Sequence, residues 1–115
     1  MESHVEKIWG YEDIIVNNNR YCGKILTIKR GYRCSLQFHK KKHETFYILS
    51  GTLLIEYGDS VLEMKEGDIL SIPPKTIHRF QPTTSEAKIL EISTHHDDRD
   101  TVRLEPGGIS DHVVL

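Results

Sequence analysis

Four side chains of the kinds that bind metal ions are spaced along the middle of the chain. Gln37 and His39 are two residues apart, so in an extended strand both project to the same side. Glu44 follows after a short basic loop, and His78 lies in a later segment, behind a pair of prolines. An amide, two imidazoles and a carboxylate around an open coordination position are typical of a catalytic metal site. The pattern indicates a metal centre, provided that the fold brings His78 to the other three groups.

Short β-strands would have to position these groups. Runs rich in β-branched and aromatic residues alternate with turn signals and predict strands over residues 7–16, 21–29, 32–39, 44–49, 52–57, 61–64, 69–72, 76–81 and 87–93. Within the third of these, the apolar row that begins with Tyr32 and Cys34 alternates with Gln37 and His39 and should face the other way. The sequence has no helical period of useful length. An all-β fold, an antiparallel sandwich or barrel, is therefore predicted.

The spacing of these groups resembles the two motifs of the cupin superfamily. Residues 37–51 read Gln-x-His-x4-Glu-x6-Gly, which resembles the first motif with Gln37 in place of its usual first His. Residues 67–78 read Gly-x5-Pro-x4-His, which resembles the second motif. The resemblance implies a single-domain double-stranded β-helix, or jelly-roll barrel. It also implies that Gln37, His39, Glu44 and His78 are the metal ligands.

Within that superfamily, the chain resembles the cupin domain of the bacterial type II phosphomannose isomerases over roughly residues 5–105. The segments that carry this resemblance are Trp9-Gly10-x-Glu12, Lys24-x4-Lys29-x-Gly31, Ser35-Leu36-Gln37 and Asp100-x-Val102-Arg103-x-Glu105. The ligand set suits Zn²⁺ first, with Mn²⁺, Fe²⁺, Co²⁺ or Ni²⁺ as alternatives, and does not suit Cu⁺. Gln37 agrees with the isomerase variant of the motif. It argues against an iron oxygenase, which usually presents two histidines and one carboxylate with open positions.

The resemblance implies aldose–ketose isomerisation through an enediolate. A divalent metal would stabilise the developing anion as a Lewis acid, and a base would move the proton between adjacent carbons. The candidates for the base and for charge stabilisation near the expected mouth are Lys24, Lys29, His43, Glu91 and Arg103. Of these we take Arg103 and Lys29 as the catalytic candidates. A fixed guanidinium at Arg103 suits a sugar phosphate or an oxyanion, although a surface ion pair with Glu105 or Asp100 is an equal alternative.

Several polar groups near the motifs have a structural and a functional interpretation. His43 could replace a ligand, but the motif register favours a loop position. His95 and His96 with Asp97 and Asp98 could hold a second metal, although a solvated polar loop is favoured because neighbours in extended chain face opposite ways. The run Lys40-Lys41-Lys42 is expected to be a solvated loop that could attract a phosphate or carboxylate. At Lys40 and Lys41 the chain departs from the family, which has a further His there.

Length and composition restrict the class of protein. A chain of 115 residues with 37% hydrophobic and 28% charged residues predicts one domain over 1–115, with a core of about 7–93 and a C-terminal arm of about 94–115. The net charge of −2 gives no case for nucleic-acid or membrane binding. Without a membrane span or a signal peptide, we expect a cytoplasmic protein with a frayed N-terminus. Cys22 and Cys34 should then be reduced core thiols.

Three functions remain open at this point. The first is a metal-dependent sugar or sugar-phosphate isomerase, and the second is a non-enzymatic sugar-binding or regulatory cupin. The third is an iron-dependent oxygenase. The expected partner is a small molecule, a sugar phosphate or another small anion. A homodimer is also expected, with residues 9–16 as the edge strand that pairs, because exposed strand edges need covering.

Overall fold

The computed structural model describes residues 3–83 and 85–110, and nearly all of its regular structure is β-strand. The strands are β1 (Ser3–Lys7), β2 (Gly10–Asn17), β3 (Cys22–Ile28), β4 (Tyr32–Arg33), β5 (Leu36–His39), β6 (Glu44–Ser50), β7 (Thr52–Tyr57), β8 (Ser60–Lys65), β9 (Ile69–Ile72), β10 (His78–Pro82), β11 (Ala87–Ser93), β12 (Thr101–Glu105) and β13 (Gly108–Ile109). A single 3₁₀ turn, η1 (Asp98–Asp100), precedes β12. Across this range no helix is long and apolar enough to cross a bilayer.

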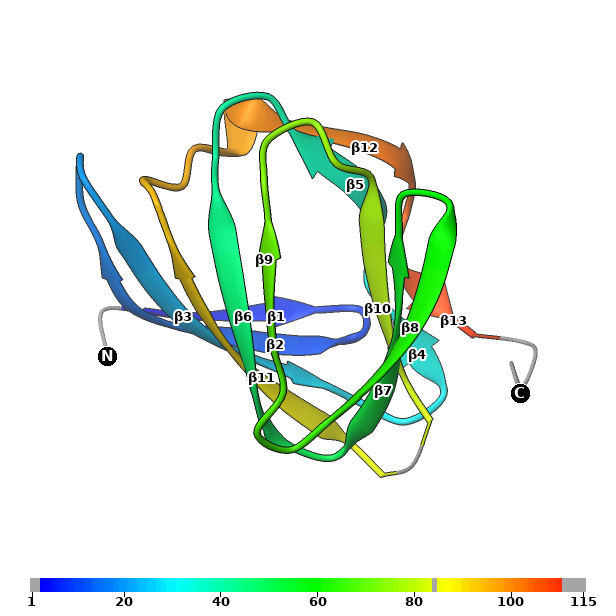
Figure 1. Ribbon diagram of the computed structural model, residues 1–115. Coiled ribbons are helices and arrows are strands. Elements are labelled where there is room, and N and C mark those ends of the chain that lie inside the picture. The colour runs from blue at the N-terminus through cyan, green and yellow to red at the C-terminus, as the bar shows by residue number, and fades with distance from the viewer. Residues whose placement is uncertain (1–2, 84, 111–115) are drawn as a thin grey trace.

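Two antiparallel sheets form the walls of a barrel (Figure 1). One sheet has the order β1-β2-β3-β11-β6-β9, and the other has the order β12-β5-β10-β7-β8. A short pair, β13-β4, lies beside them. Strands that are distant in the chain are neighbours, since β11 pairs with both β3 and β6, and β10 pairs with both β5 and β7. The all-β jelly-roll prediction is confirmed.

The interior of the barrel has an apolar end and a polar end. The inward side chains change from polar to apolar within single strands. On β6 the inward residues are Glu44, Phe46 and Ile48, all buried, while the intervening Thr45 and Tyr47 are less buried. The same change from a polar to an apolar inward residue occurs along β3, β10 and β11. Because side chains alternate along each strand, the inward residues form a packed apolar core at one end of the barrel and a polar cavity at the other.

The N-terminal residues are more ordered than the sequence predicts. Ser3–Lys7 was expected to fray because it is polar, but it forms β1 and pairs along its whole length with β2. An edge strand needs no apolar face when its backbone is hydrogen-bonded on one side and its side chains are solvated. Because β2 is paired with both β1 and β3, residues 9–16 are not an edge, and that part of the dimer prediction is wrong.

The predicted strand 32–39 is broken in the middle. β4 ends at Arg33 and β5 begins at Leu36, and the Cys34 N–H donates to the Phe80 carbonyl at 3.1 Å. This interruption changes the facing of the chain, so Cys34 lines the same cavity as Gln37 and His39 instead of facing away from them. Cys34 and Cys22 are both free thiols, as predicted.

The C-terminal region is also part of the barrel as far as the structure describes it. Residues after 94 were expected to form a loose arm because of Pro106-Gly107-Gly108, yet β12 pairs with β5 and β13 pairs with β4. The buried Arg79 guanidinium fastens this region, donating to the Cys34 carbonyl (2.9 Å), to Glu105 Oε1 (2.9 Å) and to the Pro106 carbonyl (3.3 Å). The apolar residues 113–115 lie outside the described range.

Candidate metal centre

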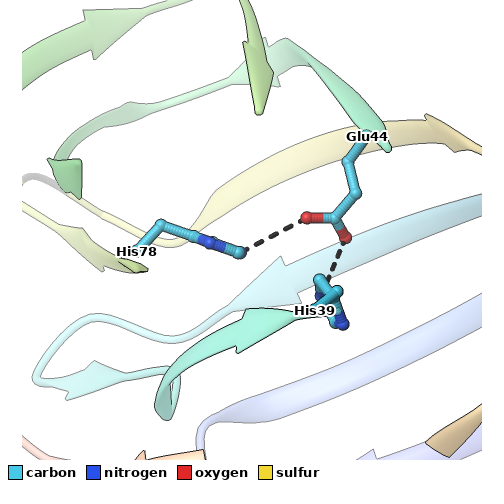
Figure 2. A group of neighbouring side chains, drawn as sticks. All are labelled: His39, Glu44 and His78. Carbon is cyan, nitrogen blue, oxygen red and sulfur yellow. Dashed lines mark ion pairs between the residues drawn. The ribbon is translucent and has the colours of Figure 1, made fainter. Parts of the chain in front are cut away.

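Three of the four candidate ligands meet at the polar end of the barrel. His39 Nε2 lies 3.3 Å from Glu44 Oε1, and His78 Nε2 lies 3.3 Å from Glu44 Oε2. One nitrogen or oxygen atom of each residue lies within 4.8 Å of the others, and all three side chains are buried. Figure 2 shows the carboxylate between the two imidazoles. Over the described residues this is the one group of three histidine, cysteine or acidic side chains that could hold a metal ion.

The strands explain why these residues converge. His39 is the last residue of β5 and Glu44 is the first of β6, so a loop of four residues separates them. His78 opens β10, where it is the register partner of Gln37 on β5. Each of the three therefore stands at a strand end with its side chain buried in the barrel.

In both imidazoles Nδ1, the nitrogen that does not face Glu44, contacts an oxygen atom of another residue. His78 Nδ1 is 2.9 Å from the Thr76 carbonyl, which can only accept, so Nδ1 carries the proton. His39 Nδ1 is 3.0 Å from Thr101 Oγ1, a residue supplied by β12. These contacts leave Nε2 of each ring directed at Glu44, and a partner of this kind fixes the tautomer and orientation of metal-binding histidines.

The arrangement fits a divalent metal because lone pairs of its imidazoles and carboxylate converge on one point. A neutral His78 with its proton on Nδ1 presents a lone pair at Nε2 to a carboxylate oxygen, which is unfavourable without a proton or cation between them. Glu44 Oε2 is buried and accepts no hydrogen bond from any described residue. One cation among the three groups would satisfy all of them, and their nitrogen and oxygen donors suit zinc and other first-row divalent ions.

Glu44 is ionised in this environment. Burial alone would raise the pKa of the carboxyl, but the neighbouring His39 and His78 imidazoles and the Lys42 ammonium outweigh burial and hold the pKa well below its ordinary value of 4.5. A metal ligand must be deprotonated, so Glu44 is ready to bind without first losing a proton.

Gln37 lies beside the three, but its orientation differs from that of a ligand. Ser35 Oγ donates to Gln37 Oε1 at 2.7 Å, and Gln37 Nε2 lies 3.5 Å from His39 Nε2. The amide would have to turn over, exchanging its oxygen and nitrogen, before its oxygen could face a metal. Ligation by Gln37 therefore stays a prediction.

Replacing Thr101 by valine is expected to weaken metal binding. The substitution keeps the shape of the side chain and removes the hydroxyl that holds His39 Nδ1. Losing such a partner typically costs about 10–100-fold in metal affinity. Competition with a chromophoric chelator would measure the dissociation constant. Thr83→Val, which removes a hydroxyl on the far side of the barrel, is the control; equal affinities in the two variants would contradict the expectation.

The low pKa of Glu44 also gives the metal-free protein a pH dependence. A carboxyl with a folded pKa below its unfolded value contributes stability that is complete above about pH 4.5 and is lost as the pH falls toward the folded pKa. The free energy of unfolding should therefore fall with acidification below pH 4.5. Urea titrations at several pH values would show a shallower fall in Glu44→Gln, and identical slopes would exclude this contribution.

The three groups open into a cavity of about 290 Å³. Its wall includes Trp9, Glu12, Lys24, Gln37, Lys42, Phe46, Glu91, His96, Asp98 and Arg103. Of the candidate base and charge-stabilising residues, Lys24, Glu91 and Arg103 line this cavity, and Arg103 is the register partner of Gln37 on β12. Lys29 and His43 are exposed and do not contribute to the wall.

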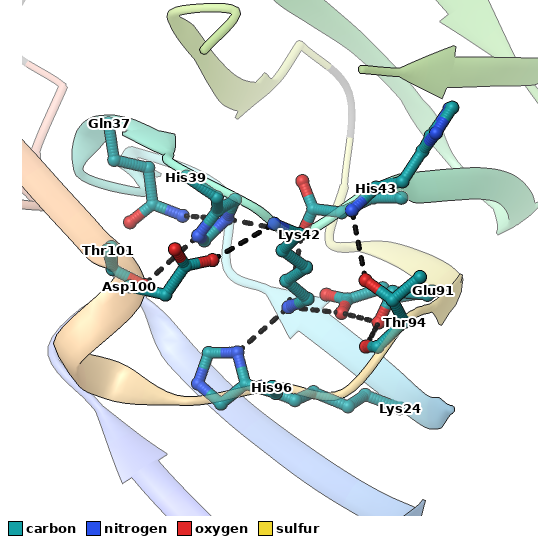
Figure 3. Close-up of polar contacts among 12 residues, drawn as sticks. Lys24, Gln37, His39, Lys42, His43, Glu91, Thr94, His96, Asp100 and Thr101 are labelled. Carbon is teal, nitrogen blue, oxygen red and sulfur yellow. Dashed lines mark hydrogen bonds and ion pairs between the residues drawn. The ribbon is translucent and has the colours of Figure 1, made fainter. Parts of the chain in front are cut away.

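Lys29 and His43 can be placed more closely from their elements. Lys29 follows the last residue of β3, whose inward residues are Lys24, Leu26 and Ile28, so it is directed outward. His43 points away from the cluster in Figure 3, and its backbone N–H donates to Thr94 Oγ1. The loop interpretation of His43 agrees with this position.

Lys42 was expected to be solvated, and that expectation is wrong. Lys40 and Lys41 are exposed, but Lys42 turns inward and is 3% exposed. Its Nζ lies 2.6 Å from Glu91 Oε2, 2.8 Å from His96 Nδ1 and 3.2 Å from Glu44 Oε1 (Figure 3). Burial alone would lower the pKa of Lys42, but Glu91 and Glu44 raise it above its ordinary value. A protonated lysine therefore stands beside the candidate metal ligands.

The loop 95–98 also differs from its predicted role. His96 lines the cavity, where Nδ1 accepts from Lys42 and Nε2 lies 2.9 Å from Asp98 Oδ1. Burial and the charges of Lys42 and Lys24 lower the pKa of His96. His95 is exposed, with Nδ1 2.6 Å from the Asn18 carbonyl. These histidines do not form a second metal cluster in the described structure.

Comparisons with solved structures agree with this fold. Among solved structures, oxalate decarboxylase from Bacillus subtilis superposes with a TM-score of 0.80 at 19% identity, covering 89% of this chain and 30% of that one. KdgF from Halomonas sp. superposes with a TM-score of 0.71 at 15% identity, covering 77% and 81%. The two-sheet barrel with its polar end is a cupin.

Sequence comparison identifies the family, whereas the structural comparison identifies only the fold. The family model described as "Mannose-6-phosphate isomerase C-terminal" matches residues 1–106, and this chain belongs to that family. Mannose-1-phosphate guanylyltransferase RfbM of Salmonella typhimurium is 31% identical over 100 residues, which are 84% of this chain and 21% of that protein. The xanthan biosynthesis protein XanB of Xanthomonas campestris is 32% identical over 104 residues, 88% of this chain and 22% of that one. The chain thus spans about a fifth of the length of these relatives.

Proposed function

We propose that this protein is a metal-dependent isomerase of a sugar phosphate, with mannose 6-phosphate as the first substrate to test. The observation that carries the proposal is the buried Glu44 carboxylate, which lies between two oriented imidazoles with one oxygen that accepts no hydrogen bond from the described residues. His39, Glu44 and His78 would hold the metal, and Gln37 would be a fourth ligand once its amide turns over. The metal would supply Lewis-acid stabilisation of the enediolate. Membership of the mannose-6-phosphate isomerase family supports the substrate class.

The charge of the cavity suits an anionic substrate. Among the described wall residues, the cations are Lys7, Lys24, Lys42, Arg79 and Arg103, and the carboxylates are Glu12, Glu44, Glu91 and Asp98. Arg79 is paired with Glu105, so the remaining four cations balance four carboxylates, and a divalent metal would make the cavity positive. Arg103 is exposed near the mouth and would bind the phosphate group through its guanidinium.

Proton transfer is assigned to Lys24. Glu91, the other candidate on the wall, is held by Lys42 and by the Ser93 hydroxyl at 2.9 Å, which leaves it less able to move toward a substrate. Lys24 is buried, and the one ion-pair contact that it makes among the described residues is the 3.5 Å contact to Glu12. We therefore place Lys24 in the role considered for Lys29, which lies outside the cavity.

Exchange of substrate hydrogen in heavy water tests the proposal directly. The metal-loaded protein is incubated with mannose 6-phosphate or fructose 6-phosphate, and incorporation of deuterium at carbon 2 or carbon 1 is followed by NMR. Exchange that depends on the metal and is lost in Lys24→Met would support the isomerase. Lys29→Met, which removes the same charge outside the cavity, is the matched control.

A second candidate is a sugar-binding module without turnover. It is favoured by the exposed Lys40 and Lys41, which stand where the isomerase family has a further His, a candidate ligand or acid–base group. In that case mannose 6-phosphate would raise the melting temperature of the metal-loaded protein but would show no exchange. An iron oxygenase would instead require iron in the purified protein, which elemental analysis would detect, and oxygen uptake.

We also propose that the protein works in the cytoplasm as a homodimer. β1 is one of the two edge strands of the larger sheet, and it replaces residues 9–16 as the pairing strand because it lies next to them in the order. Light scattering during size exclusion would measure the mass, and a monomer of 13.3 kDa would remove this part of the proposal.

A further inference from the structure

The ammonium group of Lys42 uses all of its hydrogen-bonding capacity within the cavity wall. It has three N–H groups and three neighbours, Glu91 Oε2 at 2.6 Å, His96 Nδ1 at 2.8 Å and Glu44 Oε1 at 3.2 Å. No proton is left over for a ligand in the cavity. Lys42 therefore acts on the protein's own groups, and the nearest of functional interest is Glu44.

A bound metal and Lys42 would have to share the Glu44 carboxylate. Oε1 lies between Lys42 Nζ and His39 Nε2, while Oε2 faces His78. A metal held by these three ligands would lie on the same carboxylate as the ammonium. Two cations a few ångströms apart in a buried site repel each other, and the low polarizability of the interior strengthens the repulsion.

Lys42 is also held so that it cannot easily withdraw. Glu91 is fixed by the Ser93 hydroxyl, and His96 is fixed through its backbone, which exchanges hydrogen bonds with the Asn17 side chain at 3.0 and 3.1 Å. The lysine stem has almost no exposed surface. Its charge therefore stays in place when a metal enters.

We propose that Lys42 is a built-in counter-cation of Glu44: it keeps the carboxylate in position in the metal-free protein and, by its charge, limits the affinity of the site for a divalent metal. This inference rests on the metal site of the proposed function. The candidate ligands then have two kinds of neighbour. The Thr101 hydroxyl is neutral and only orients a ligand, so its loss should weaken binding, whereas loss of the Lys42 charge should strengthen it.

Three single variants test whether loss of the Lys42 charge strengthens or weakens metal binding. Lys42→Met removes the charge and keeps the length of the stem, Lys42→Arg keeps a charge, and Lys41→Met removes the same charge from the adjacent exposed position. The dissociation constant for Zn²⁺ is measured by competition with a chromophoric chelator. We expect Lys42→Met to bind on the order of tenfold more tightly than wild type, the scale on which partners of metal ligands act. Lys41→Met should stay within about twofold, because an exposed charge is screened by solvent.

Lys42→Arg distinguishes charge from shape. It should remain closer to wild type than Lys42→Met does, and an arginine variant that binds zinc as tightly as the methionine variant would overturn the charge argument. Unchanged or weaker binding in Lys42→Met would overturn the proposal itself and would make Lys42 an orienting partner like Thr101.

Lys42→Met leaves the buried Glu91 without its cation, which is expected to destabilise the fold. A second comparison separates this effect from the effect on metal binding. The pair Glu91→Gln and Lys42→Met/Glu91→Gln repeats the comparison with that carboxylate neutral, and the double variant should again bind more tightly. Failure of wild type to bind zinc would count against the proposed function. Binding gained by Lys42→Met in that case would still support the inference, and no binding in either would overturn both.

Discussion

Glu44→Gln is expected to abolish stoichiometric binding of a divalent metal. The amide is nearly the same shape as the carboxylate, but it lacks the negative charge that draws a cation between His39 and His78. Since losing even an outer partner of a ligand costs about 10–100-fold, losing the single anionic ligand should cost roughly a hundredfold or more. Elemental analysis after dialysis against zinc would give the stoichiometry, and calorimetry would give the affinity.

The barrel should survive this change. Lys42 keeps Glu91 as its counter-ion at 2.6 Å, so no buried cation is left unpaired. Glu63→Gln is the matched control, because it makes the same change of net charge on the exposed face of β8. Stoichiometric metal in Glu44→Gln, with a normal circular dichroism spectrum, would show that the centre lies elsewhere.

Gly10→Ala is expected to cause a large loss of stability. Gly10 has φ +150°, and a Cβ placed on it would stand 1.9 Å from the Thr27 carbonyl oxygen. That oxygen is backbone in the middle of the larger sheet, so β2 and β3 would have to separate where Gly10 pairs with Ile28. We expect a cost of about 4 kcal/mol or more, in the exceptional range for point substitutions. Urea unfolding would measure it.

Substitution of a second glycine separates the effect of the steric clash at Gly10 from the effect of a positive φ. Gly58 also has a positive φ, +58°, but a Cβ there would meet no atom within 4 Å. Gly58→Ala should therefore cost only the left-handed penalty of about 1–2 kcal/mol. Similar losses in the two variants would mean that β2 moves aside easily and that the contact with Thr27 does not constrain the sheet.

The architecture and the closeness of His39 and Glu44 were predictable because they depend on short-range patterns. Alternation of side chains fixes which residues of β6 face inward, and four residues between His39 and Glu44 leave the chain no room to separate them. His78 was reached only through the resemblance to cupin motifs, since no local pattern links residues 39 and 78. The exact orientation of Gln37, with Ser35 on its oxygen, depends on contacts that the sequence does not specify.

The buried charges around the site were harder to predict. Lys42 lies two residues before Glu44, a spacing that places both on one side of an extended chain, but the composition of the run 40–42 suggested a solvated loop. His96 drew notice only as part of the polar run 95–98, and its place on the cavity wall could not be predicted because it depends on Asn17, 79 residues earlier. Charges that compensate one another across distant segments can be buried, and a sequence read locally does not show the compensation.

β1 and β12 were missed for a related reason. β1 is a polar strand without the alternation that marks a half-buried strand, and its pairing comes from backbone hydrogen bonds to β2. β12 does alternate, as Thr-Val-Arg-Leu-Glu, but it is only five residues long and lies between the polar residues 94–100 and Pro106. Their side chains nevertheless matter, because Lys7 and Arg103 line the cavity.

The late position of β12 has a consequence for the biosynthesis of the protein. Thr101, which holds His39 from behind, and Arg103, which lies beside Gln37, are separated from those partners by more than sixty residues of chain. During translation the candidate ligands on β5, β6 and β10 leave the ribosome before the strand that completes their surroundings. Tight metal loading should therefore follow the emergence of residues 101–105, and ribosome-bound chains stalled before that point should exchange zinc faster than chains released from the ribosome.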